Sequence, residues 1–144
     1  MPKIAIIYAS GMGRTKKMAE AIANGAMTIE GTQVLLKDAF DALPEDVSDA
    51  DAIVLGGSTY NYKLIRSMDP FLKELAKLGL KGKVGLAFGS HGWSGEGVPT
   101  LIARMKSFGM SVIEPGIAVV QVPTKEDIEK CFLLGRSIAM GLVN

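Results

Sequence analysis

The sequence is poor in the residues that build disulfides and metal sites. Its 144 residues include one cysteine, Cys131, and one histidine, His91. A single cysteine excludes an internal disulfide and is typical of a protein kept in a reducing compartment. One histidine beside one cysteine leaves too few ligands for a classical zinc site. We therefore predict a cytoplasmic protein that binds no metal.

The sequence also lacks an excess of one charge and lacks long hydrophobic runs. Its 16 basic and 15 acidic residues leave a formal net charge of +1, and both signs are spread along the chain. This distribution predicts no surface for nucleic acid and no polybasic membrane anchor. No apolar run reaches the length of a membrane span, and residues 1–4 lead directly into a predicted strand, which argues against a signal peptide. The length suits one domain over residues 1–144.

What the sequence does have is an alternation of strand and helix patterns. The continuous apolar run Ile4–Ala9 is typical of a strand that is covered on both faces. Further strands are predicted over residues 32–36, 52–55, 83–89 and 110–120. The last of these is predicted to be interrupted at residues 114–116, where Pro115 removes a hydrogen-bond donor and favours a bend or an edge position. Five alternations with helices predict an α/β three-layer sandwich with a flavodoxin-like, five-stranded parallel sheet in the order 2-1-3-4-5.

With this strand order, the loops after the first, third and fourth strands meet at one crevice, where open α/β sheets bind ligands. The first loop, Ser10–Thr15, offers hydroxyl groups, flexible glycines and the free N–H groups of a helix N-terminus. Together these groups suit a phosphate monoester. The loop lacks the Gly-Lys-Ser/Thr ending of the triphosphate loop and the spacing of the dinucleotide motif. As a bare pattern, it is equally typical of an ordinary turn before a helix.

The other two loops carry aromatic side chains. The segment Ser58–Tyr62 is polar and aromatic, and the loop after the fourth strand holds Trp93, the one tryptophan of the chain. A planar heteroaromatic ligand held between aromatic side chains, with its phosphate on the helix N-terminus, would account for all three loops. The alternative is that Trp93 packs inside a glycine-rich loop. No partner carboxylate can be assigned to His91, which we interpret as a solvated loop residue.

At these residues the chain resembles the flavodoxin family. The pattern Ser-x-x-Gly-x-Thr over residues 10–15 matches the loop that holds the phosphate of flavin mononucleotide (FMN), although Met12 stands where many members have Thr or Ser. The loop Phe88–Gly95 and the segment Val122–Cys131 are similar to the flavodoxin domain of the A-type flavoproteins, or flavo-diiron proteins. The similarity runs over nearly the whole chain. One histidine could not replace a diiron centre, so the oxygen or nitric oxide reduction of those proteins is not expected here.

The resemblance implies FMN as the cofactor, with three sets of contacts. The phosphate would be held by Ser10, Met12, Gly13, Arg14 and Thr15. The flavin ring would lie along Ser58, Thr59, Tyr60 and Asn61. The other side of the slot would be lined by Ser90, His91, Gly92, Trp93 and Gly95, with Trp93 packed against the ring. No residue is assigned a catalytic role.

The sequence thus predicts an FMN-binding electron-transfer protein of the short-chain flavodoxin type. It would shuttle electrons between redox partner proteins, as a monomer or weak homodimer, and is favoured as a carrier over an enzyme with its own substrate. Two alternatives stay open, namely a small FMN-dependent NAD(P)H or quinone reductase and a flavin-free interaction module. A regulatory receiver domain is nearly excluded, because it needs acidic residues where Ala9-Ser10 and Gly57-Ser58 stand. Flavodoxins are mostly acidic, and the near-neutral charge here argues against partner choice by a basic docking face.

Overall fold

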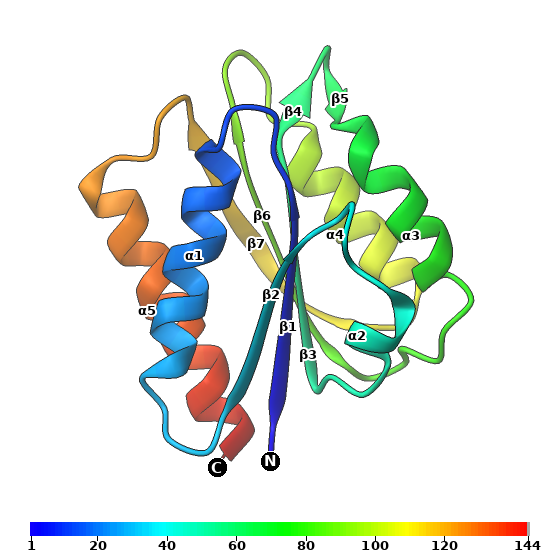
Figure 1. Ribbon diagram of the computed structural model, residues 1–144. Coiled ribbons are helices and arrows are strands. Elements are labelled where there is room, and N and C mark those ends of the chain that lie inside the picture. The colour runs from blue at the N-terminus through cyan, green and yellow to red at the C-terminus, as the bar shows by residue number, and fades with distance from the viewer. Residues whose placement is uncertain (144) are drawn as a thin grey trace.

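The computed structural model, which describes residues 1–143, contains a five-stranded parallel sheet (Figure 1). Its strands are β1 (Lys3–Ala9), β2 (Gln33–Asp38), β3 (Ala52–Gly57), β6 (Val84–His91) and β7 (Ser111–Val120). The strand order is β2-β1-β3-β6-β7, and every neighbouring pair is parallel. The predicted fold class and the predicted order 2-1-3-4-5 are therefore confirmed.

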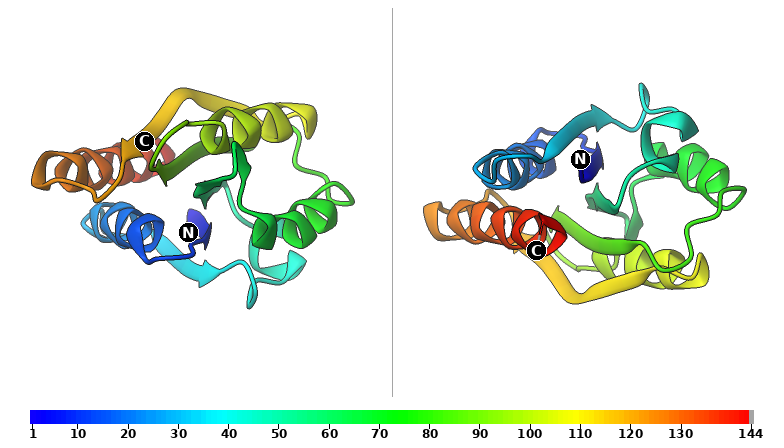
Figure 2. Two further views of the ribbon diagram at one scale, coloured as in Figure 1. Left: turned by 90° about the horizontal axis from the view of Figure 1, so that it is seen from above. Right: turned by 90° about the horizontal axis from the view of Figure 1, so that it is seen from below.

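Helices cover both faces of the sheet, and the views along the strands in Figure 2 show the three layers. On one face lie α1 (Arg14–Met27) and α5 (Lys125–Val143). On the other lie α2 (Pro44–Ser48), the 3₁₀ helix η1 (Arg66–Met68), α3 (Asp69–Leu75) and α4 (Gly97–Ser107). The N-terminus and the end of α5 lie at the lower edge of the sheet, opposite the carboxyl ends of the strands (Figure 1).

Each face of the sheet contributes to its own hydrophobic core. Along β1, Ile4 and Ile6 belong to the core under α1 and α5, whereas Ala5 and Ile7 belong to the core on the opposite face. Every residue of β1 and of β3 is buried. Because both faces of these central strands are covered, the sequence reads there as unbroken apolar runs instead of an alternating pattern.

β6 is longer than predicted, and β7 is one continuous strand where an interruption was predicted. β6 continues to His91, so Ser90 and His91 belong to the strand and not to the following loop. It continues because β7 pairs with it as far as Val120 opposite His91. β7 runs through Pro115 as one strand, so the predicted interruption at residues 114–116 is wrong, although the pairing with β6 shifts its register there. The strand lies at the edge of the sheet, which is one of the two positions that the proline favoured.

The segment after β3, predicted as a loop, forms a short antiparallel hairpin of β4 (Thr59–Tyr60) and β5 (Lys63–Leu64). Its two turn residues, Asn61 and Tyr62, have φ angles of 51° and 63°. Two consecutive residues with positive φ are the mark of a type I′ turn, which matches the twist of a two-residue hairpin. The hairpin rises at the same edge of the sheet as the loop that precedes α4 (Figure 1).

Candidate functional site

The carboxyl ends of β1, β3 and β6 bring three segments together at the upper edge of the sheet (Figure 1). β1 leads into residues 10–13, β3 into the β4–β5 hairpin, and β6 into residues 92–96. The ends of β3 and β6 lie so close together that a β-carbon on Gly89 would overlap the Gly57 carbonyl oxygen. The Thr59 hydroxyl also accepts a hydrogen bond of 2.8 Å from the Gly97 N–H at the start of α4. The predicted convergence of three loops is thus present.

The segment between β1 and α1 has the features of an anion site. Gly13 has a φ of 83°, a conformation that favours glycine, and its N–H donates to Ser10 Oγ over 2.9 Å. The Lys17 N–H donates to the Gly13 carbonyl over 3.1 Å, so the N–H groups of residues 14–16 have no acceptor within the helix. No acidic residue stands in the first turn of α1, and three of its first four residues are basic. Free N–H groups and positive charge together favour a bound phosphate.

Two exposed aromatic side chains line the cleft that lies beside this segment. Tyr60 on β4 is 67% exposed, and Trp93 in the loop after β6 is 86% exposed. This exposure contradicts the interpretation in which Trp93 packs inside its own loop. Both residues line one cleft of about 500 Å³, a volume within the usual range for small-molecule sites.

Most residues predicted to bind the cofactor line this cleft, here called the flavin cleft. Its lining residues are Gly11, Met12, Arg14, Ser58, Thr59, Tyr60, Asn61, Ile65, Ser90, His91, Gly92 and Trp93. All of them except Gly11 and Ile65 were predicted from the sequence. Their contact with FMN itself stays a prediction.

Four predicted residues lie outside this lining. Ser10 lines a neighbouring groove, and its hydroxyl accepts the hydrogen bond from the Gly13 N–H. Gly13 is the N-cap residue of α1. Gly95 lies against the imidazole ring of His91, where a β-carbon would be 3.4 Å from the nearest ring atoms. Thr15 is fully buried. In the structure these residues shape the surrounding backbone or pack beneath the cleft.

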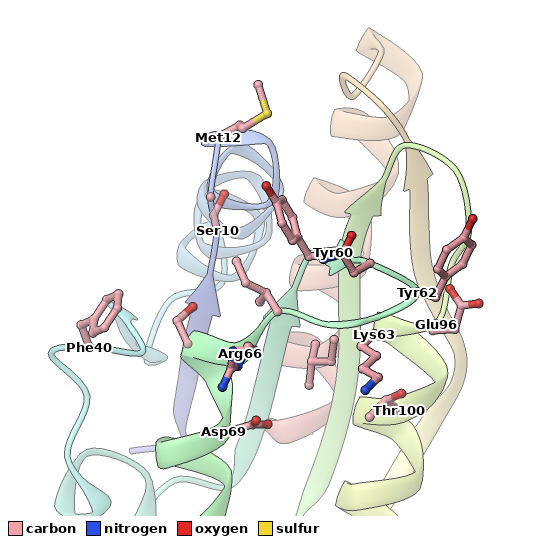
Figure 3. Close-up of a pocket in the computed structure, with 15 residues that line it drawn as sticks. Ser10, Met12, Phe40, Tyr60, Tyr62, Lys63, Arg66, Asp69, Glu96 and Thr100 are labelled. Carbon is pink, nitrogen blue, oxygen red and sulfur yellow. The ribbon is translucent and has the colours of Figure 1, made fainter.

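The neighbouring groove has a volume of about 1120 Å³ and shares part of its lining with the flavin cleft (Figure 3). Phe40, in the segment between β2 and α2, lies at one end of it and is 81% exposed. Neither Phe40 nor Ile65 was predicted from the sequence. Phe40 lies in the turn after β2, and Ile65 follows the two-residue strand β5, so no periodic pattern marks either of them.

Three hydroxyl groups from three different elements meet beneath the flavin cleft. Thr15 Oγ1 on α1 lies 2.9 Å from Ser58 Oγ and 3.1 Å from Ser90 Oγ. The Ser90 N–H also donates to Thr15 Oγ1 over 3.3 Å. Because Ser58 and Ser90 line the cleft, this cluster links the start of α1 to both segments that would hold the flavin ring.

His91 lies at the end of β6 with its Nδ1 atom buried. That atom has no hydrogen-bond partner among residues 1–143. The His91 carbonyl accepts a hydrogen bond of 2.6 Å from the Gln121 N–H, which fixes the end of β6 against the end of β7. Within the described residues, no carboxylate is hydrogen-bonded to the His91 imidazole, and we assign the residue no catalytic role.

Other reactive groups of the described chain are placed differently. Burial, with a smaller effect of the Asp127 charge, raises the pKa of the Cys131 thiol to about 11, so the thiol is protonated at neutral pH. Over residues 1–143, no three His, Cys, Asp or Glu side chains are grouped so that they could hold a metal ion. The helices of the same range include none with the length and apolar character needed to cross a membrane.

FMN fits the chemistry of the residues that are present. The start of α1 supplies N–H groups and positive charge for a phosphate, and the flavin cleft supplies exposed aromatic surface for a planar ring. Large exposed rings beside a cleft are costly to leave in water, and a bound ring would cover them. The two halves of the site lie next to each other, since Met12 and Arg14 of the first segment also line the cleft.

Comparison with known proteins gives matches along the whole chain. The family model described as flavodoxin matches residues 6–135. A flavodoxin from Aquifex aeolicus is 34% identical over 160 residues, a match that covers 96% of this chain and 86% of that protein. A solved structure described as a flavodoxin from the domain Archaea has a TM-score of 0.93 and 36% identity, and the match covers 99% of both chains.

A second group of relatives consists of larger proteins. A nitric oxide reductase from Moorella thermoacetica is 38% identical over 143 residues, which covers 95% of this chain but 35% of that protein. Other members carry the names type A flavoprotein and flavo-diiron protein. The chain spans about a third of the length of these curated relatives. The predicted resemblance to the flavodoxin domain of the A-type flavoproteins is confirmed.

Proposed function

The chain belongs to the flavodoxin family and is an FMN-binding electron-transfer protein, and from this premise we propose that it holds FMN in the flavin cleft between Tyr60 and Trp93. The observation that carries the proposal is the pair of exposed aromatic residues lining a cleft beside the basic start of α1. Electrons would pass through this cleft to and from redox partner proteins.

The protein would bind and orient the cofactor with two separate parts of the site. The N–H groups at the start of α1 and the positive charge of Arg14 would hold the phosphate. Tyr60 and Trp93 would stack on the ring and keep water away from it. When bound, FMN supplies the redox chemistry, and the protein adjusts it through stacking, hydrogen bonds and local charge.

The partners and the cellular setting are part of the proposal. We propose that the protein acts in the cytoplasm, because its one cysteine is buried and unpaired. We also propose that it acts as a monomer or weak homodimer. The net charge of +1 supports partners that are not selected by strong charge attraction. Nucleic acids and membranes are not among the proposed partners. The nitric oxide reduction named for a larger relative is not proposed for this chain, which spans 35% of that protein.

Titration of the flavin-free protein with FMN tests the proposal. Trp93 is the one tryptophan of the chain, so its fluorescence reports directly on the cleft. We expect quenching that saturates at one FMN per chain and a yellow protein with flavin absorption. A colourless protein whose Trp93 fluorescence does not change when FMN is added would contradict the proposal. Sustained NAD(P)H consumption by the purified holoprotein alone would favour the reductase alternative.

A further inference from the structure

We propose that His91 takes up a proton from water when the FMN in the flavin cleft is reduced, so that the positive imidazole balances one negative charge that the electrons bring. The inference rests on the proposed function, because the cleft that His91 lines is the one in which FMN is placed. It concerns the one histidine of the chain.

The His91 side chain is held at the wall of the flavin cleft. His91 is the last residue of β6, and its carbonyl is fixed to the end of β7 by the hydrogen bond from the Gln121 N–H. The imidazole ring lies against Gly95, where an added β-carbon would be 3.4 Å from both Cδ2 and Nε2. His91 is partly exposed, so protons from water can reach it. The strand end and the loop thus hold a protonatable group beside the proposed ring site.

The cleft gives this imidazole no fixed negative charge. Among residues 1–143, no aspartate or glutamate lines the flavin cleft. Glu96, the nearest acidic residue along the chain, lines the neighbouring groove, and no ion pair joins it to His91 within the described range. A carboxylate partner would hold a histidine in its charged form. Without one, the imidazole is free to respond to a charge that appears in the cleft.

The elements packed against the end of β6 supply one fixed charge to the cleft. Arg14 at the start of α1 is the permanently charged residue of the described lining, and Tyr60 on β4 is its other titratable residue. On β7, the uncharged Val120 pairs with His91, and α4 carries no charged side chain before Arg104. Tyrosine and arginine side chains titrate well above neutral pH. Within this lining, His91 is therefore the group whose charge changes between about pH 5 and pH 8.

The buried Nδ1 atom makes the charged form depend on what occupies the cleft. An imidazolium has two N–H donors, whereas the neutral ring has one donor and one acceptor. Nδ1 has no hydrogen-bond partner among residues 1–143, so these residues offer no acceptor for an N–H at that position. The described residues thus add no hydrogen bond that favours the imidazolium. A negative charge on the bound ring is the interaction left to favour it.

The electrons and the proton come from different sources. Each electron from a redox partner protein adds one negative charge to the bound ring. The proton comes from water, forms an N–H bond on His91 and adds one positive charge beside the ring, and no bond of the protein breaks. Because linkage is reciprocal, a protonated His91 favours reduction of FMN to the same extent that reduction favours protonation. The reduction potential should therefore depend on pH through His91.

Proton NMR of the holoprotein tests the inference on the wild type, because one histidine gives one set of imidazole resonances. We expect the pH midpoint of these resonances to lie about one pH unit higher when FMN is fully reduced with dithionite, which is a proton affinity about tenfold higher. Lys81→His, in the turn that precedes β6, adds an imidazole at the opposite end of the strand as an internal control. A His91 midpoint that does not move, or moves no more than the control, would overturn the inference.

The reduction potential gives a second readout. His91→Gln keeps a polar side chain that does not titrate. We expect the two-electron potential of the wild type to lie about 30 mV above that of His91→Gln at about pH 5, the equivalent of the tenfold difference, and to meet it by about pH 9. Protons that the ring itself takes up are common to both proteins and cancel in this difference.

The outcomes separate this inference from the proposed function. A potential difference that stays constant with pH would mean that the substitution acts through the shape of the cleft and not through a proton, which overturns the role of His91. A wild-type protein that binds no FMN would instead overturn the proposed function.

Discussion

Gly25 of α1 lies against the backbone of Phe132 in α5, with no room for a side chain between them. A β-carbon on Gly25 would overlap the Phe132 carbonyl oxygen, and one on Gly135 would overlap the Ile22 carbonyl oxygen. The two helices therefore cross at a reciprocal pair of glycines. Because the start of α1 is where we propose that the phosphate binds, this crossing helps to set the position of that proposed site relative to the sheet.

We expect Gly25→Ala to lower the free energy of unfolding by about 3 kcal/mol, because the atoms that it would strike belong to the backbone and cannot rotate away. Urea denaturation followed by circular dichroism measures the loss. The matched control is Gly141→Ala in the last turns of α5, where an added β-carbon meets nothing within 4 Å. There, alanine should raise stability by up to about 1 kcal/mol. Equal stability of the two variants would show that the helices can separate freely.

The sheet could be predicted from the sequence, whereas this helix crossing could not. β1 and β3 are buried on both faces, which favours apolar residues at nearly every position. Such continuous apolar runs predict central parallel strands. A glycine within a helical pattern carries no such signal, because it indicates only a weak helix former. Which glycines touch depends on how two helices lie across each other, and that is set by the packing of the whole α1–α5 layer.

The place of the site could be predicted from the strand order, whereas the directions of its side chains could not. The positions of Tyr60 and Trp93 follow from strand ends, which the strand order brings together. The burial of Thr15 does not follow from its place in a motif, because the direction of a side chain in the first helical turn depends on how the helix sits on the sheet. The β4–β5 hairpin was also missed, since Tyr62 occupies a turn position where the usual signal is glycine.

This misfit of Tyr62 gives a second prediction. Its φ of 63° is unfavourable for a bulky residue, and its side chain is 63% exposed and loses little packing on removal. We expect Tyr62→Gly to raise the free energy of unfolding by about 0.5 kcal/mol, the relief of strain exceeding the entropy cost of glycine. Thermal denaturation measures it. Lys63→Gly, one residue later in β5, should destabilise the protein, and a Tyr62→Gly protein that melts lower than wild type would argue against strain.

The ion pair of Lys3 and Asp49 gives a prediction about pH. Lys3 Nζ lies 2.6 Å from Asp49 Oδ1, and this hydrogen bond, only partly offset by desolvation, holds the pKa of Asp49 below its ordinary value of 3.8. Because the folded-state pKa is the lower one, the pair stabilises the fold above pH 3.8, and this contribution is lost as the pH falls through the folded-state value.

We therefore expect Asp49→Asn to be less stable than wild type at neutral pH and equally stable in strong acid. Urea midpoints measured from about pH 7 to about pH 2 should converge only below about pH 4. Asp41→Asn serves as the control, since Asp41 forms no ion pair within residues 1–143. A stability difference that stays constant down to the lowest pH would mean that the charge of Asp49 is not what matters.

Removal of the Trp93 ring should separate cofactor binding from folding. With 86% of the side chain exposed, Trp93→Ala should change the stability of the flavin-free protein by less than about 0.5 kcal/mol. The same variant should raise the Kd for FMN by about tenfold, because it removes one aromatic surface of the cleft. The quenching of FMN fluorescence on binding measures this Kd without a tryptophan. Phe40→Ala is the matched control, since Phe40 is 81% exposed but does not line the cleft. Tight FMN binding by Trp93→Ala, or equal losses in both variants, would place the ring elsewhere on the protein.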